Sequence, residues 1–282
     1  MSTLALTLVL IAAFAHAGWN LFAKTAEGGT TFVWLGAAAG CVLYFPALVV
    51  ALIVAPGTLG ATAALFMVVS GSLHSVYFVL LQRGYRDGDL SLVYPLARGT
   101  GPLLATIAAI VFFAERPSPL ALAGGALIVG AVLSLVTRPS EGQEAGIVFA
   151  LLTGVSIAAY TLWDKQAVSD QDISPIVYFW GLGLTNTLLL TPWVLTRGEG
   201  IRRTWNSSKR QAIGVGALSP LAYILVLFAL VHAPVSYVAP AREVSILIAT
   251  VLGTTVLAEE GTVHRLVAAV GIVLGIAALA IG

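Results

Sequence analysis

Long apolar runs dominate the sequence, and they restrict the fold more than any other feature. A helix needs about 20 mostly apolar residues to span a bilayer. Of the 282 residues, 59% are hydrophobic and only 10% are charged, so a water-soluble domain would leave too much apolar surface in water. The runs are continuously apolar rather than alternating, which favours helices over barrel strands. We therefore expect an all-α integral membrane protein with ten transmembrane helices, at residues 3–23, 31–53, 62–82, 90–114, 119–137, 145–165, 174–196, 210–231, 235–258 and 264–281.

The first run is predicted to stay in the protein as a span. No positive charge precedes it, and it continues through Trp19 and Phe22, beyond the small residues that imitate a signal-peptidase site. The segments between runs are too short to hold a soluble domain. We expect a multi-pass protein of the cell inner membrane.

The chain matches itself at a fixed offset of 145 residues. The matched pairs suggest two five-helix repeats, residues 1–137 and 145–282, joined by a loop at 138–144. Because five is odd, the second repeat must enter the membrane in the opposite orientation, as in the inverted repeats of many secondary transporters. Lys24 and Lys165 form a weaker pair at offset 141. The pairs at 145 are Gly71 with Gly216, Leu73 with Leu218, Ser91 with Ser236, Val93 with Val238, Pro95 with Pro240, Glu115 with Glu260, and Gly130 with Gly275.

Basic residues gather on one side of the predicted bundle. Loops after the odd-numbered helices carry ten Lys or Arg residues, whereas the other side has only Arg116 and Lys165. Since basic loops tend to remain in the cytoplasm, both termini should lie outside it. The ten are Lys24, Arg83, Arg86, Arg138, Arg197, Arg202, Arg203, Lys209, Arg210 and Arg265.

Three ionisable residues fall inside predicted spans at related positions of the two repeats. Arg98 lies in the fourth span, and Arg242 and Glu243 lie in the ninth. Such groups usually face the bundle interior or a wet cavity, because charge in hydrocarbon is costly. A guanidinium group matches a carboxylate or phosphate, so Arg98 could contact an anionic substrate. It could instead pair with Glu243 or reach the interface, and Glu243 could carry a proton.

Polar and aromatic residues on five spans could line a central cavity. His16, Trp19 and Asn20 share one face of the first helix by their spacing. Interhelical hydrogen bonding or interfacial anchoring is the structural alternative for each of these residues. The remaining candidates are His74, Tyr77, Tyr94, Tyr160, Trp163 and Tyr223.

Other chemistry finds little support in the sequence. There is no Walker loop, nucleophile elbow or His-Glu-x-x-His motif, the four histidines are scattered, and Cys41 is the one cysteine. We therefore expect no enzyme activity, no cofactor, no metal and no nucleic-acid partner. Glu115 and Glu260 are expected to bind backbone amides at the start of the following short helix.

These residues together resemble the EamA-type family of the drug/metabolite transporter superfamily. The resemblance is carried by residues 16–20 (His-Ala-Gly-Trp-Asn), 94–99 (Tyr-Pro-Leu-Ala-Arg-Gly) and 239–243 (Ala-Pro-Ala-Arg-Glu), with Glu115 and Glu260. It implies two five-helix EamA repeats and transport of small metabolites, often amino-acid export, by alternating access. It also implies a cavity formed mainly by helices one, three, four, six, eight and nine. Family members commonly have cytoplasmic termini and basic residues after helix two, whereas the loop at 55–60 here has no charge.

The sequence as a whole predicts a secondary transporter in the bilayer, either a monomer or a weak homodimer. Its predicted substrate is an amino acid or a related zwitterion or anion, most simply as an export cargo. An exporter of lipophilic drugs or cations is the alternative within transport. A membrane-embedded enzyme and a non-transporting scaffold are the alternatives from other classes.

Overall fold

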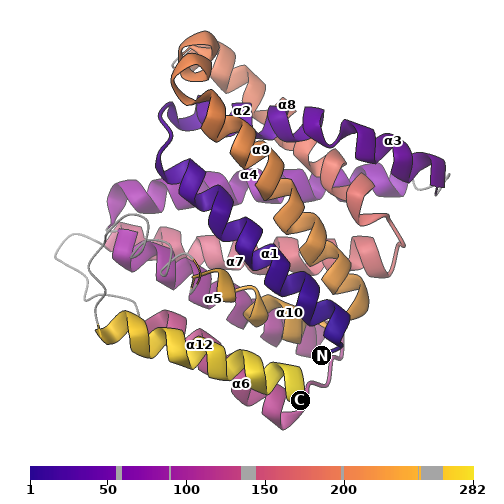
Figure 1. The fold of residues 1–282 in the computed structure, drawn as a ribbon, viewed down its shortest axis with the longest axis vertical. Coiled ribbons are helices and arrows are strands. Elements are labelled where there is room, and N and C mark those ends of the chain that lie inside the picture. The colour runs from indigo at the N-terminus through magenta and orange to yellow at the C-terminus, as the bar shows by residue number, and fades with distance from the viewer. Residues whose placement is uncertain (55–58, 89, 135–143, 198–199, 247, 249–262) are drawn as a thin grey trace.

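Helices are the only regular secondary structure in the described residues. The computed structural model describes residues 1–54, 59–88, 90–134, 144–197, 200–246, 248 and 263–282, and no strand occurs among them. The predicted all-α class is therefore confirmed (Figure 1). The helices of the first half are α1 (Thr3–Lys24), α2 (Gly29–Leu43), α3 (Phe45–Val54), α4 (Ala61–Asp87), α5 (Leu90–Phe112) and α6 (Pro119–Ser134). Those of the second half are α7 (Glu144–Ser169), α8 (Pro175–Arg197), α9 (Ile201–His232), α10 (Val235–Ala241) and α12 (Val263–Ile281).

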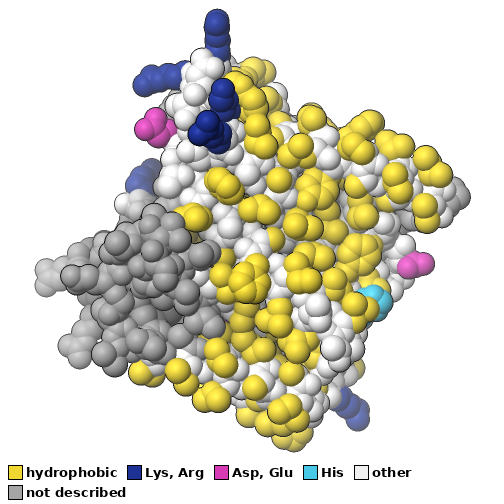
Figure 2. Space-filling view, in the orientation of Figure 1, with side chains coloured by type: hydrophobic (Ala, Val, Ile, Leu, Met, Phe, Trp, Pro, Cys, Tyr) yellow, Lys and Arg dark blue, Asp and Glu magenta, His cyan; other side chains and the backbone are white. Residues whose placement is uncertain are grey.

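Several of these helices can cross a membrane. In the described part of the chain, α1, α4, α5, α7 and α9 are long and apolar enough, and the bent pair of α2 and α3 brings the number to six. Figure 2 shows a face covered by apolar side chains, with most of its visible Lys and Arg side chains at one end. The protein is therefore a multi-pass membrane protein, whereas the count of ten spans remains a prediction.

The predicted span at 31–53 is not one straight helix. The chain bends by 44° between α2 and α3, where Tyr44 has φ −94° and ψ 2°. Pro46 comes two residues after Tyr44 and has no N–H to donate to the preceding turn, which explains the break. The Tyr44 hydroxyl donates to Ala217 O at 2.7 Å, so the bend is fastened to α9.

Helices from the two halves pack closely against one another. The main interhelical contacts join α1 and α2 to α9, α4 to α7 and α8, α5 to α7, and α6 to α12. Small residues allow these approaches. Gly40 meets Gly216 where α2 crosses α9, and a Cβ atom on Gly124 would lie 2.6 Å from Gly275 O where α6 crosses α12. The glycines therefore set the distance between helices at these crossings.

Glu115 binds backbone amides, as predicted, but not those of the helix that follows it. Its carboxylate accepts from Val235 N at 2.8 Å and from Ser236 N at 2.9 Å, at the start of α10. The helix that follows Glu115 is α6, so the prediction named the wrong helix. The carboxylate instead satisfies amides that the first turn of any helix leaves unpaired, in the other half of the chain. Glu260 lies outside the described residues.

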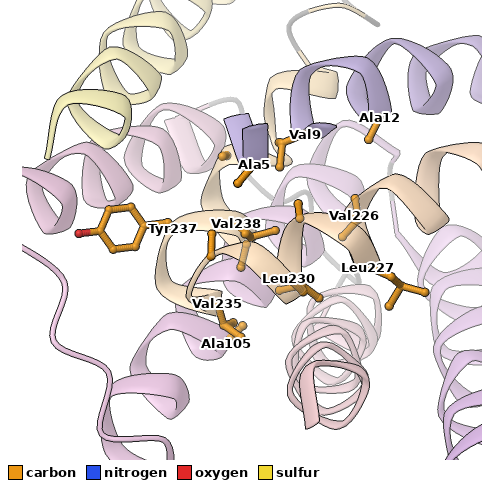
Figure 3. Close-up of a cluster of buried hydrophobic side chains, with 14 of the residues drawn as sticks. Ala5, Val9, Ala12, Ala105, Val226, Leu227, Leu230, Val235, Tyr237 and Val238 are labelled. Carbon is orange, nitrogen blue, oxygen red and sulfur yellow. The ribbon is translucent and has the colours of Figure 1, made fainter. Parts of the chain in front are cut away.

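An apolar cluster fills the bundle near the start of α1. Figure 3 shows small and branched side chains of α1, α9 and α10 packed against one another. Ala5, Leu227, Leu230, Val235 and Val238 have no exposed surface. This end of the bundle is therefore closed by tight apolar packing.

The crossing of α2 and α9 leads to a stability prediction. A Cβ atom on Gly216 would lie 2.8 Å from Gly40 N and 3.0 Å from Gly36 O, which are backbone atoms that cannot rotate away. Gly216→Val should destabilise the protein by about 1–3 kcal/mol through overpacking, measured by thermal unfolding in detergent. Gly130→Ala is the control, because nothing lies within 4 Å of its added Cβ. Equal melting temperatures for the two variants would contradict the close crossing.

Candidate functional site

A cavity of about 480 Å³ lies between the helices, within the range of small-molecule sites. Its lining includes residues from all six helices that the resemblance implied, and residues of α2 and α8 as well. Ten of the twelve sequence-predicted site residues line it: His16, Trp19, Asn20, His74, Tyr77, Tyr94, Arg98, Tyr160, Tyr223 and Arg242.

The predicted polar face of α1 forms one side of the cavity. Trp19 Nε1 donates to His16 Nδ1 at 3.3 Å, and Asn20 Nδ2 donates to His16 O at 2.8 Å. These bonds stay within α1, so they orient the three residues without joining them to another helix. All three residues line the cavity, so α1 contributes polar groups to its wall.

Aromatic rings of α4, α7 and α9 form a second wall. His74 stacks on Tyr160 with ring centroids 4.0 Å apart and meets the edge of Tyr223 at 5.3 Å. Tyr77 approaches Tyr160 edge-on at 6.0 Å. Contacts of this geometry are favourable beyond the area they bury. The wall therefore presents apolar rings with hydroxyl groups at their tips.

Arg98 pairs with Glu243 inside the bundle. Its Nε atom donates to Glu243 Oε2 at 3.0 Å, and Nη2 lies 3.4 Å from Ser245 Oγ. Only 6% of Arg98 and 2% of Glu243 are exposed. Of the alternatives that the sequence left open, the structure shows internal pairing, and burial excludes snorkelling to the interface. The pair joins α5 to the segment after α10.

Arg242 is positioned differently from Arg98. α10 ends at Ala241, and the chain turns at Arg242 and Glu243, so the two side chains leave at the end of a short helix that contains Pro240. The Arg242 guanidinium lies 5.3 Å from the ring centroid of Tyr223, within the range of a cation–π contact. In the described part of the chain, Arg242 forms no ion pair with a carboxylate. It is therefore a cation in the cavity wall whose hydrogen-bond donors can bind an anion.

Trp163 and Glu243 do not line the cavity. Trp163 donates to Phe66 O at 3.0 Å and stacks on the Phe66 ring at 4.4 Å, so it fastens α7 to α4. The Glu243 carboxylate accepts a hydrogen bond from Arg98 Nε. Both were predicted as candidate site residues, and in this structure their contacts are within the protein.

Asp164 is the main feature that sequence reasoning missed. It has no exposed surface, and it accepts hydrogen bonds from Ser70, Tyr178 and Tyr223. The span predicted to end at residue 165 placed this carboxylate at a helix end, whereas α7 continues to Ser169. Its position four residues after Tyr160 on the same helix face was the available signal.

Asn186 of α8 was also missed. It lines the cavity, and its Oδ1 atom accepts from Ser75 Oγ at 2.5 Å. Its side-chain amide adds a neutral hydrogen-bonding group to the lining. No group of three or more His, Cys, Asp or Glu residues in the described part of the chain could hold a metal ion.

Comparisons with known proteins bear on the family and the fold of the chain. Residues 144–281 match the EamA-like transporter family. No curated protein sequence matches the chain. The fold is similar to 29 solved chains, including a crystal structure described only as that of a protein. That structure has a TM-score of 0.78 and 15% sequence identity over 99% of this chain and 96% of the other. At this identity the likeness concerns the fold alone. Through residues 144–281, the chain belongs to the EamA-like transporter family, as the resemblance implied.

Proposed function

We propose that this protein is a secondary transporter for a small metabolite with a carboxylate group, such as an amino acid or a related zwitterion or anion. The observation that supports this most is Arg242, a cation in the cavity wall that forms no ion pair in the described residues. Its guanidinium group can bind a carboxylate with two parallel hydrogen bonds.

The charges near the cavity favour an anionic group at Arg242 rather than at Arg98. Arg98 and Glu243 neutralise one another at 3.0 Å. His16 lies in the electrostatic field of both arginines, so the carboxylate would sit between α1 and the end of α10. Arg242 belongs to the second proposed repeat and α1 to the first, and transporters with inverted repeats commonly hold their substrates at the interface between the two.

The aromatic wall would receive the rest of the substrate. The rings of Tyr77, Tyr160 and Tyr223 offer apolar surface for a hydrophobic part and π faces for an ammonium group. Asn186 adds a neutral polar contact. The same wall supports the alternative, a lipophilic cation exporter, and Arg242 is the feature that argues against it.

Alternating access between two inverted repeats would move the substrate. The contacts of α1 and α2 with α9 correspond to those of α7 and α8 with α4 if the halves are exchanged. The family match at 144–281 nearly coincides with the second proposed repeat, residues 145–282. We take residues 1–137 as the first repeat and 138–144 as the loop between them, with ten spans in all.

The cavity supports a state open at one end. Its lining continues to Ala26 and Gly29, where α1 ends and α2 begins, but includes no residue before Val9. At the other end, the apolar cluster of Figure 3 and the contact between Glu115 and α10 close the bundle. Opening would require these contacts to separate while the first end closes.

The proposed topology puts the open end in the cytoplasm. Lys24, Arg83 and Arg86 lie toward this end of α1 and α4, and basic residues favour the cytoplasmic side. Both termini would then be outside the cytoplasm, in the inner membrane. A cytoplasmic opening suits loading for export, and no enzymatic step is proposed. A monomer contains the whole cavity, and at most a weak homodimer is proposed.

Solute counterflow in proteoliposomes tests the proposal. The labelled probes are L-alanine, L-leucine, L-phenylalanine, L-glutamate and succinate, with tetraphenylphosphonium as the lipophilic cation. Wild-type protein should exchange at least one carboxylate probe saturably. Arg242→Gln should raise half-saturation by about 10- to 100-fold, because a hydrogen bond to a charged group contributes about 1.5–3 kcal/mol.

Arg86→Gln is the matched control, because its side chain is 76% exposed and lies outside the cavity. It should exchange like the wild type. Exchange of tetraphenylphosphonium alone would replace the carboxylate proposal with the cation exporter. Carboxylate exchange unaffected by Arg242→Gln would remove Arg242 from the site.

A double substitution tests the stabilising role of the Arg98–Glu243 ion pair separately from substrate binding. Arg98→Met leaves Glu243 buried without its cation, and removing one partner of a buried pair costs about 3–5 kcal/mol. Arg98→Met should therefore lower the melting temperature strongly, and Arg98→Met with Glu243→Met should recover most of the loss. Thermal unfolding in detergent measures both. If the single variant is as stable as the double variant, the pair is not what joins the halves.

A further inference from the structure

Asp164 is a buried carboxylate held by three hydroxyl groups. Ser70 Oγ and Tyr178 Oη donate to Oδ1 at 2.7 Å and 2.6 Å, and Tyr223 Oη donates to Oδ2 at 2.5 Å. None of these donors is a cation, and no ion pair involves Asp164 in the described part of the chain. A buried carboxyl group in this setting can exist either as a hydrogen-bonded anion or as a protonated acid.

A chain of donors leads from the cavity to Asp164. His74 lines the cavity, and its Nδ1 atom lies 2.9 Å from Ser70 O. A carbonyl oxygen only accepts, so Nδ1 carries a hydrogen and Nε2 is the free acceptor. Nδ1 also lies 3.4 Å from Ser70 Oγ, which in turn donates to Asp164. The Nδ1 hydrogen can therefore be shared between Ser70 O and Ser70 Oγ, and only the Ser70 hydroxyl donates directly to the carboxylate.

The geometry points to Asp164 as a proton-binding site that is loaded from the cavity through His74 and Ser70. A proton from the cavity binds His74 Nε2, the Nδ1 proton passes to Ser70 Oγ, and the Ser70 hydroxyl proton passes to Asp164 Oδ1. The carboxyl group ends neutral, Ser70 is unchanged, and His74 ends as its other neutral tautomer. No other reactant is needed.

The other ionisable groups around Asp164 lie on several helices. Tyr160 lies on its own helix, Tyr178 faces it from α8, and Tyr223 faces it from α9. Arg242, after α10, lies over the Tyr223 ring, and Arg98 of α5 is paired with Glu243. Phenol and guanidinium groups do not normally titrate near neutral pH, so Asp164 and His74 are the groups suited to exchange the proton.

Tyr223 connects this site to the proposed carboxylate site. Its hydroxyl binds Asp164, and its ring lies 5.3 Å from the Arg242 guanidinium. A substrate carboxylate at Arg242 would offset that positive charge and favour a proton on Asp164. By reciprocity, the proton would favour the carboxylate. This coupling rests on the proposed function, but the proton site does not. A cell that accumulates the metabolite would release it together with a proton.

Infrared difference spectroscopy on the full chain in lipid tests the proton site without any substrate. Acidifying the sample should produce the carbonyl stretch of a protonated carboxyl group. Asp164→Asn should remove this band, since the amide keeps similar size but cannot bind the proton. Asp170→Asn is the control on the exposed turn after α7 and should keep it. A band that persists in Asp164→Asn, or is absent from the wild type, would overturn the inference.

Ser70→Ala tests the relay while keeping the carboxyl group, and it serves if Asp164→Asn does not fold. After a pH jump, the rate at which the band appears should fall by about tenfold or more, because a positioned proton-transfer group is lost. An unchanged rate would refute the route through Ser70.

The coupling is tested separately, by the internal pH of wild-type liposomes during downhill flux of an exchanged carboxylate probe. Flux without proton movement would refute the coupling and leave the proposed carrier intact.

Discussion

The cost of placing charge inside a membrane governs the arrangement of this protein. Arg98 and Glu243 are buried inside the helix bundle. Burying either charge without the other would be energetically costly. Their pairing requires α5 and the segment after α10 to meet, which in turn sets where α10 ends. Once this pair is neutral, Arg242 on the adjacent position is left without a partner in the described residues, facing the cavity. The same constraint that stabilises the bundle therefore leaves a guanidinium group in the cavity wall without a carboxylate partner among the described residues.

At the closed end of the bundle, backbone polar groups also need partners inside the protein. The chain turns sharply between α9 and α10, and that turn leaves carbonyl and amide groups without helical partners. Lys165 donates to Leu230 O and Ala233 O at the end of α9, while Glu115 accepts from two amides at the start of α10. Each of these side chains crosses from another helix, so they satisfy the backbone and bind helices together at once. A movement that opens this end would have to release charged groups into water, which is possible at the membrane surface but not deeper.

The sequence allowed the fold class and most of the cavity residues to be predicted, because both depend on local and repeated patterns. His16, Trp19 and Asn20 share a face by spacing alone, and Arg98 and Arg242 stand out as charges within apolar runs. The partners across helices were harder to predict. Nothing in the chain indicates that Trp163 reaches Phe66 O, or that Asp164 is shared by three hydroxyl groups from different helices. These depend on where helices cross and on a helix end that was placed too early. The bend after Tyr44 carried a local signal in Pro46, which the strong hydrophobicity of the run concealed.

Tyr223 shows why a cavity in a transporter needs support from behind its lining. A phenol ring on α9 could rotate if its hydroxyl had no fixed acceptor, and Arg242 would then lose the ring that it lies over. Asp164 holds the hydroxyl at 2.5 Å and is itself held by α4 and α8. The position of the Tyr223 ring under Arg242 thus depends on a carboxyl group that is not part of the cavity lining. Since a hydroxyl group can either donate or accept, Tyr223 can keep its place whether Asp164 is charged or neutral, although the direction of the bond would reverse. A ring held in this way can transmit a change of charge without changing the shape of the site.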